Sequence, residues 1–487
     1  MTQVKIVRQC SALSVLLVLV NVASLNAQET LKKANVLEKM TLANNYFMKK
    51  WPDPTVNIVT DKSRPSNIWT RAVYYEGLMA MYRIDPETTY YNYAVQWAEG
   101  HSWEPAYGGT TTRIADNQAC GQTYIELYQT NPQPQRIAKI KTDIDNMIHS
   151  SAINDWWWVD AFQMAMPVFA KLGAVYQDTT YFSKMYQMYM YTKTAEGDSG
   201  LYNKVDHLWW RDSTFQPPHT SPNGEDTYWS RGEGWVLAAL ARVLDVMPAD
   251  APHRNEYVAT FKEMAEAIVA VQRNDGFWNV SLHDATEYGG PETSGTALFT
   301  FGLAWGVNKG VLTDSVYRSA AIRGWKGMVD SALHSNGFLG YVQSTGKQPS
   351  DGQPVTYDKA PNFEDYGLGA FLLAGSEIYR MAGETTGMSS ENTTANIAIP
   401  TAATLHPAYP NPFNPQTTIT YSLNRNGHVV LAVFDMTGRK IETLVNRYQN
   451  SGDHRIVLDA STLTSGTYMI RLDVDGFTQS RKVTILK

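Results

Sequence analysis

The sequence predicts an all-α (α/α)6 barrel followed by a small C-terminal β-sandwich. From about residue 31 to residue 382, apolar residues recur at spacings of three and four, which indicates amphipathic helices. After residue 403, shorter segments alternate between apolar and polar residues, as strands with one buried face do. The helical segments form six hairpins, each with an earlier, more charged helix and a later, more apolar one: 31–50 with 69–83, 90–99 with 116–129, 134–148 with 159–173, 180–193 with 231–246, 254–273 with 293–308, and 315–333 with 365–381.

The second helix of each hairpin carries Gly and Ala as well as large apolar residues, as in VLAALARVL and SGTALFTFGLAWG. A helix that is apolar on most sides belongs inside a protein, and an amphipathic helix covers it. Six inner helices surrounded by six outer ones make the predicted barrel. The loops that lead into the inner helices hold the polar and aromatic residues, such as NDWWWVD and TYWSRGEGW. Because loops on a rigid scaffold carry function, we expect a cleft at this end of the barrel.

The two ends of the chain indicate export. Lys5 and Arg8 precede the apolar run SALSVLLVLV, and a small-residue cleavage site ends at Ala27, which predicts a signal peptide over residues 1–27. Residues 384–403 are rich in Thr, Ser and Ala and are typical of a linker. We therefore expect a barrel domain over 28–383, a β-sandwich over 404–487, and no membrane span in the mature chain.

Composition excludes several classes of function. The net charge of -6 and the absence of a long basic run argue against a nucleic-acid partner. No Walker loop, HExxH motif, zinc-type cysteine pair or GxSxG elbow occurs, so we expect neither a metal nor another cofactor. The 14 Trp and 28 Tyr suit either a surface that contacts sugars or an ordinary core.

The stretch WWWVDAFQMAMP places Asp160 directly after three tryptophans. Removing an ionised carboxylate from water is costly unless it is paired or protonated. In a helical register Met164 shares the face of Asp160, whereas Phe162 lies nearly opposite. Asp116 occupies the same relative place one hairpin earlier, so the two carboxylates can face each other across a cleft, with the pKa of one raised. The alternative is that each aspartate is an N-cap.

The stretch TYWSRGEGW supplies an arginine between two indoles. Arg231, with Trp229 and Trp235, suits a sugar carboxylate, because the guanidinium offers a charged fork and the rings cover an apolar face. The alternative is that Arg231 pairs with Glu233 or another acid.

Four motifs in order, WVDAFQMAMPVFAKLG, WSRGEGW, ETSGTALFTFGLAWG and DYGLGAFLLAGSEI, resemble those of glycoside hydrolase family 105, the unsaturated rhamnogalacturonyl hydrolases. These enzymes are related to the unsaturated glucuronyl hydrolases of family 88. The resemblance covers residues 31–382 and implies an (α/α)6 barrel that hydrates the double bond of a 4,5-unsaturated uronic acid left by a polysaccharide lyase.

The resemblance also assigns residues. It implies that Asp160 is the general acid/base, that Asp116 is the second aspartate, and that Arg231 and Trp235 contact substrate. Asn203 stands where many members have a histidine, which puts the contact to the next sugar in question. The full set of expected substrate-binding residues is Arg231, Trp235, Trp229, Trp158, Met164 and Asn203.

The tail has its own resemblance. LHPAYPNPFNPQTTITYSL, FDMTGRKIETL and the terminal KVTILK resemble C-terminal sorting domains of the type IX secretion system. This implies that the secretion machinery is a partner and that the protein is secreted or held at the cell surface. A carbohydrate-binding or adhesive module is the alternative for this domain.

Together these patterns predict a hydrolase that removes unsaturated galacturonyl or glucuronyl residues from lyase products of pectin, ulvan or a related acidic polysaccharide. Two alternatives remain at this point. One is an inverting glycosidase that acts on saturated acidic glycans with two carboxylates. The other is a non-catalytic sugar-binding surface protein, for which an aromatic cleft alone would suffice.

Overall fold

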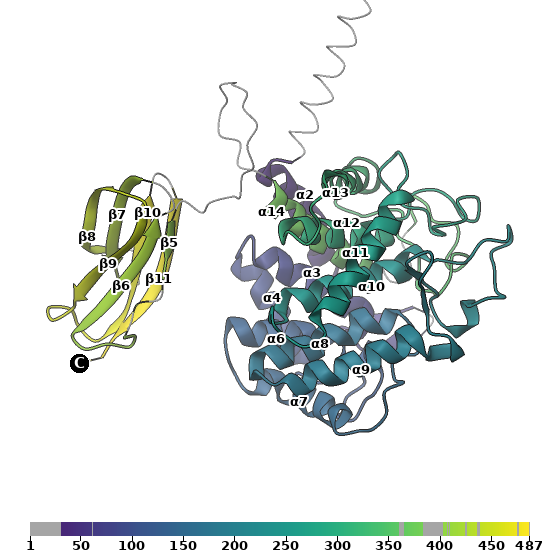
Figure 1. The fold of residues 1–487 in the computed structure, drawn as a ribbon, viewed down its shortest axis with the longest axis horizontal. Coiled ribbons are helices and arrows are strands. Elements are labelled where there is room, and N and C mark those ends of the chain that lie inside the picture. Colours follow the sequence, from purple (N-terminus) through teal and green to yellow (C-terminus); the bar gives the residue numbers. More distant parts are fainter. Residues whose placement is uncertain are drawn as a thin grey trace, which may run out of the picture. The chain divides into compact units, whose positions relative to one another are not determined.

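A computed structural model of the protein describes residues 31–60, 62–359 and 365–382, together with most of residues 403–486 (Figure 1). The chain divides into two compact units, one ending at Thr386 and the other beginning at Gly387. The predicted signal peptide and nearly all of the predicted linker lie outside the described residues. In the second unit the described ranges are 403–406, 408, 410–423, 426–435, 439–474 and 477–486.

The first unit is the predicted (α/α)6 barrel. The inner helices contact one another in the order α3, α6, α8, α10, α12 and α14, and α14 in turn contacts α3, which closes the ring. The helix expected at 116–129 is broken at Ala119 into α5 and α6. The outer helices are α2 (Lys33–Lys50), α4 (Thr88–Gly100), α7 (Gln135–Ile148), α9 (Thr179–Thr194), α11 (Arg254–Ala270) and α13 (Ser315–Gly327), which continues into the π-helix η3 (Met328–Ala332). The inner helices are α3 (Trp69–Tyr82), α5 (Ala115–Gln118) with α6 (Cys120–Thr130), α8 (Asp160–Tyr176), α10 (Ser230–Val246), α12 (Thr293–Asn308) and α14 (Asp365–Met381).

Glycines allow the first and last inner helices to touch. A Cβ at Gly77 of α3 would lie 2.4 Å from the carbonyl oxygen of Gly369 in α14, closer than any side chain tolerates. A buried ion pair joins the same helices, since Arg71 Nε lies 2.8 Å from Asp365 Oδ2. The small residues of the inner helices therefore close the ring by direct backbone contact.

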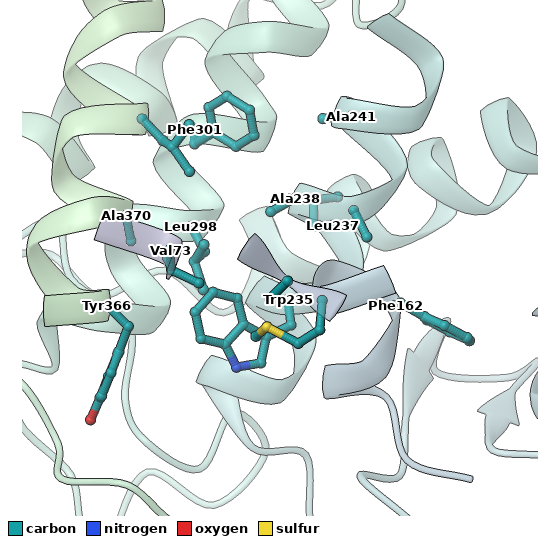
Figure 2. Packing of buried hydrophobic residues seen from close by; sticks show 14 of the residues in the cluster. Val73, Phe162, Trp235, Leu237, Ala238, Ala241, Leu298, Phe301, Tyr366 and Ala370 are labelled. Carbon is teal, nitrogen blue, oxygen red and sulfur yellow. The ribbon is translucent and has the colours of Figure 1, made fainter. Parts of the chain in front are cut away.

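The barrel axis is filled by side chains from the inner helices. Figure 2 shows Trp235 of α10 among Val73 of α3, Leu298 of α12 and Tyr366 of α14, and all four are buried. Deeper along the axis the filling becomes polar: both carboxylate oxygens of Glu76 accept hydrogen bonds from glutamine side chains, and burial raises the pKa of Glu76 to about 7. The barrel is thus a packed core, and its site must lie at the end where loops lead into the inner helices.

Those loops contain short elements. Two small hairpins, β1 (Ile58–Val59) with β2 (Ser63–Arg64) and β3 (Tyr202–Asn203) with β4 (Leu208–Trp209), precede α3 and α10. Two short 3-10 turns, η1 (Glu196–Asp198) and η2 (Ser213–Phe215), flank the second hairpin.

The second unit is the predicted β-sandwich. One sheet has the strand order β5-β6-β9 and the other β11-β10-β7-β8, and apolar side chains from both sheets share one core. The strands are β5 (Ala403–Leu405), β6 (Gln416–Leu423), β7 (Gly427–Phe434), β8 (Lys440–Gln449), β9 (Gly452–Asp459), β10 (Gly466–Val474) and β11 (Phe477–Ile485). Within the described residues of both units, no helix has the length and apolar character needed to cross a membrane.

Candidate active site

An open pocket of about 260 Å³ lies where the inner helices α3 and α5 begin. Trp69 and Thr70 of α3 line one side, and Thr345, in the loop before α14, lines another. Asp116, the second residue of α5, is half-buried and is the acidic residue among those that line the pocket. Asp116 accepts no hydrogen bond from a described residue, so its carboxyl group is available to a ligand in the pocket.

Asp160 begins the neighbouring inner helix, α8, and is only 8% exposed. Its Oδ2 accepts a hydrogen bond from Arg211 Nε at 3.0 Å. The loops that lead to the two aspartates are tied together, because Arg113 donates two hydrogen bonds to Asp155 at 2.6 and 2.5 Å. The loops before the two aspartates are therefore fixed to each other.

Neither aspartate is a helix cap. The N-cap positions of α5 and α8 are Ile114 and Val159, so each aspartate lies inside the first turn of its helix. The N-cap alternative therefore does not describe this structure, although a carboxylate in a first turn still interacts favourably with the helix dipole.

The pair is electrostatically asymmetric. Burial and, next, the negative charge of Asp160 raise the pKa of Asp116 to about 7, while Arg211 opposes the shift. Asp160 instead has the Arg211 guanidinium as its direct partner. Near neutral pH the carboxyl group of Asp116 is therefore about half protonated.

The three tryptophans before Asp160 serve different purposes. Trp156 is buried, with its ring edge-on to Phe162 and Phe169 at centroid distances of 6.1 and 5.5 Å. Trp158 is nearly buried and forms a β-bridge with Asp212. Trp157 is 50% exposed, and its ring lies 4.6 Å from that of Trp158. The first and third tryptophans fix the start of α8, and the second is exposed to solvent beside Arg211.

The guanidinium group of Arg231 is not free to bind a ligand. Its side chain is fully buried, and its guanidinium donates to the carbonyl oxygens of Gln343 and Ser344 at 2.9 and 2.8 Å and to Ser294 Oγ at 3.3 Å. Glu233 is not its partner, since that carboxyl group accepts from the Trp209 backbone N–H. Arg231 therefore holds the loop between η3 and α14, a role that differs from both interpretations of the sequence.

The other expected substrate-binding residues are also held by the protein. Trp229 Nε1 donates to Gln343 Oε1 at 2.9 Å, and Asn203 Nδ2 donates to Tyr228 Oη at 2.7 Å and to Asp206 Oδ2 at 3.1 Å. Met164 and Trp235 are buried, and Trp235 lies edge-on to Trp69, the ring that lines the pocket, with centroids 6.2 Å apart. Of the predicted site residues, Asp116 lines this pocket directly and Asp160 interacts with Asp116 through its charge.

Comparison with known proteins shows the family of this chain. Residues 39–382 match Glycosyl Hydrolase Family 88, which spans the entire ring of helices. The chain belongs to this family. It is accordingly a glycoside hydrolase, and the predicted resemblance is confirmed.

Two curated relatives of this family 88 chain are each named unsaturated 3S-rhamnoglycuronyl hydrolase. The protein from Formosa agariphila is 34% identical over 335 residues, which cover 64% of this chain and 84% of the relative. The protein from an Alteromonas species is 31% identical over 339 residues, which cover 65% of this chain and 78% of the relative.

Solved structures share the fold of this family 88 chain. A glycosyl hydrolase family 88 protein from Bacteroides vulgatus has a TM-score of 0.65 and 32% identity over 72% of this chain and 99% of that one. A family 105 glycoside hydrolase from C. acetobutylicum has a TM-score of 0.56 and 19% identity over 70% of this chain and 98% of that one. The second likeness supports the fold alone.

Residues 407–486 match the secretion system C-terminal sorting domain. This match covers β6 to β11 of the β-sandwich and indicates type IX secretion to the cell surface or the extracellular space, as the motifs of the tail predict.

Arg211 is a residue of the site that the sequence motifs did not predict. A signal for it exists, since LWWRD repeats the pattern of WWWVD, with consecutive tryptophans close before charged residues. The spacing within one segment does not reveal which distant carboxylate such an arginine meets.

Replacing Asp116 with Asn should stabilise this family 88 enzyme at alkaline pH. Because the pKa of Asp116 is raised in the folded state, its stabilising contribution is complete below pH 4 and is lost as the pH rises through about 7. Asparagine cannot ionise, so we expect the Tm of Asp116→Asn to exceed that of the wild type at pH 8 by about 2 °C, with a smaller or no difference at pH 4. Calorimetry at both pH values measures this. A Tm difference that is the same at the two pH values would contradict the raised pKa.

Proposed function

We propose that this glycoside hydrolase removes a 4,5-unsaturated uronic acid from the non-reducing end of oligosaccharides produced by a polysaccharide lyase. The observation that carries the proposal is the acidic pair beside the open pocket, in which Asp116 is about half protonated near neutral pH and Asp160 is paired with Arg211. The relatives named unsaturated 3S-rhamnoglycuronyl hydrolase support the substrate class.

The reaction is a hydration. The C4–C5 double bond of the substrate is an enol ether, so a proton added at C4 leaves positive charge at C5 that is shared with the ring oxygen. Water then adds at C5 and loses a proton, and the hemiketal that forms opens with cleavage of the glycosidic bond. The chemistry needs one group that gives a proton and one that accepts a proton, each within hydrogen-bond reach of its target.

The pair supplies both groups at neutral pH. A half-buried carboxylic acid with a pKa near 7 is well matched to proton transfer, and Asp160, which accepts a hydrogen bond from Arg211, is the second acidic group of the pair. The ring of Trp69, which lines the pocket with Asp116 and packs edge-on against the buried Trp235, forms an apolar base in the pocket. Such a base suits the apolar face of a sugar ring and excludes water.

The biological setting follows from the two ends of the chain. We propose that residues 1–27 are a signal peptide, that the barrel spans 28–383 and the linker 384–403, and that residues 404–487 deliver the enzyme through the type IX machinery. Outside the cell, it would act after lyases have cut an acidic polysaccharide that contains uronic acid and rhamnose, such as ulvan or the rhamnogalacturonan of pectin.

The test is a panel of lyase-generated oligosaccharides from rhamnogalacturonan, ulvan and glycosaminoglycans, each beside its untreated polysaccharide. We expect the ultraviolet absorbance of the unsaturated uronate to disappear with at least one lyase product. The untreated polysaccharides, which lack the double bond, should stay intact. Release of sugar from an untreated polysaccharide without loss of absorbance would overturn the proposal in favour of a conventional inverting glycosidase.

A further inference from the structure

The exposed large apolar side chains of the first unit gather at one end of the barrel. Within the described residues, the loops that lead into α3, α5, α8, α10 and α12 each expose at least one of them to solvent. At the opposite end of the barrel, Tyr176 and Val316 are the exposed residues of this kind. Single exposed apolar residues are normal, but a concentration of them at one end of a protein indicates a surface that binds a ligand or a partner.

Tyr107 lies on the rim of the pocket that Asp116 lines. The residue lines the same pocket and is 62% exposed. Its backbone has a φ of +64°, a left-handed conformation that is uncommon for residues other than glycine. The loop is nevertheless fixed here, because the Ala106 N–H donates to the carbonyl oxygen of Asn117 in α5 at 2.9 Å. Among the described residues the Tyr107 side chain has no hydrogen-bond or ring partner, so internal packing does not account for an aromatic residue at this position.

Trp157 exposes a second ring, on the loop that leads to Asp160. The residue is 50% exposed, although tryptophan is highly buried on average. Its ring is supported by the protein, since it lies 4.6 Å from the ring of Trp158 and 5.9 Å from the guanidinium carbon of Arg211. A supported ring that is half in water loses little conformational entropy when a ligand stacks on it.

The two rings belong to adjoining loops. Arg113 of the first loop donates to both carboxylate oxygens of Asp155 in the second loop, two positions before Trp157. Ile114, next to this arginine, is 54% exposed and lines the same pocket as Tyr107. Tyr107, Ile114 and Trp157 therefore form an apolar strip that extends from the rim of the pocket across the joined loops.

The pocket is small for an oligosaccharide. Sites for drug-sized ligands enclose about 300–1,000 Å³, whereas this pocket has about 260 Å³. The terminal sugar of the proposed substrate must reach Asp116, so the later sugars of a longer substrate leave through the mouth of the pocket and pass over its rim. Aromatic rings such as those of Tyr and Trp suit ligands that combine apolar faces with polar edges, as sugars do.

We propose that the apolar strip binds the sugars that follow the first leaving-group sugar, so that the enzyme prefers unsaturated tetrasaccharides and longer products to unsaturated disaccharides. The proposal rests on the function proposed above and adds the chain length of the substrate to it. The position of the strip favours a carbohydrate over a protein partner, because a protein bound on Tyr107 would cover the pocket.

The experiment measures the chain-length preference. One lyase digest of the best-cleaved polysaccharide supplies an unsaturated disaccharide and an unsaturated tetrasaccharide, and the loss of ultraviolet absorbance gives kcat/KM for each. For Tyr107→Ala and Trp157→Ala we expect kcat/KM on the tetrasaccharide to fall roughly 10-fold, mainly through KM, and kcat/KM on the disaccharide to change by less than about twofold. Trp157→Phe, which keeps an aromatic ring, should retain most of the preference.

Tyr176→Ala is the matched control. Tyr176 is 42% exposed and ends α8, the helix that Asp160 begins, so the control removes an exposed aromatic ring at the opposite end of the barrel. It should match the wild type on both substrates. An unchanged ratio of the two kcat/KM values in either alanine variant, or equal losses on both substrates, would overturn the strip as proposed.

A binding measurement separates this proposal from the proposed function. Calorimetric titration with unsaturated tetrasaccharides of ulvan and of rhamnogalacturonan uses Asp160→Asn, which should bind them without turnover, alone and combined with Tyr107→Ala or Trp157→Ala. We expect each strip substitution to weaken binding about 10-fold. Equal affinities with and without the strip substitutions would overturn the strip. If the wild type cleaved no lyase product, the proposed function would fail, and the same titration would still decide whether the strip binds sugar chains.

Discussion

Asp160→Asn should lose nearly all turnover while the barrel remains folded. The amide has the shape of the carboxylate and can still accept the hydrogen bond from Arg211 Nε, so the start of α8 should keep its position. The amide cannot take a proton from water, however, and general acid–base catalysis contributes roughly 10²–10⁴-fold to rates of this kind. We expect kcat to fall by about 10³-fold, with little change in substrate affinity.

Three measurements check this result together. Steady-state kinetics on the best lyase product gives kcat, calorimetric titration gives substrate affinity, and circular dichroism gives helical content. Wild-type reactions in deuterated water provide the mechanistic control, because hydration places solvent deuterium at C4 of the released product. Substantial turnover by Asp160→Asn, or product without deuterium at C4, would refute the assignment of the pair.

Arg231→Ala should destabilise the barrel strongly and lose activity only as a result. The substitution removes the guanidinium donor from the carbonyl oxygens of Gln343 and Ser344, of which the Gln343 oxygen still accepts from the Tyr366 hydroxyl, and it removes a large buried side chain that packs on Trp229 and Tyr366. Hydrogen bonds from a charged group contribute about 1.5–3 kcal/mol each, and a buried cavity adds to the loss. We therefore expect the free energy of unfolding to fall by about 3–5 kcal/mol.

Urea denaturation of Arg231→Ala measures the loss, with Arg273→Ala as the control for removal of a partly exposed arginine. The control should change the free energy of unfolding by less than about 1 kcal/mol. If Arg231→Ala instead kept its stability and lost only kcat/KM, Arg231 would bind the sugar carboxylate, as the sequence suggested.

Sequence periodicity was sufficient to predict the barrel. All six helical hairpins occur where apolar residues recur at spacings of three and four, because that pattern arises when one face of a helix is buried. The same periodicity was sufficient to predict that Asp116 and Asp160 lie at the starts of neighbouring inner helices, because it places each aspartate in the first turn of its helix.

The partners of the charged residues could not be predicted in the same way. The carbonyl oxygen of Gln343 that satisfies Arg231 lies 112 positions away in the chain, and Arg211 lies 51 positions from Asp160. Local spacing describes which residues share a helix face, whereas these contacts depend on how separate loops meet.

The contact between α3 and α14 has a consequence for the order of events during biosynthesis. The buried pair Arg71–Asp365 joins residues 294 positions apart, so the ring cannot close until α14 has been synthesised. Contacts this distant in sequence form slowly, and a partly synthesised barrel exposes apolar helix faces that favour aggregation. Because translation proceeds from the N-terminus, the sorting domain appears only after α14. Every chain that can be selected for export by this tail therefore already carries the helix that completes its barrel.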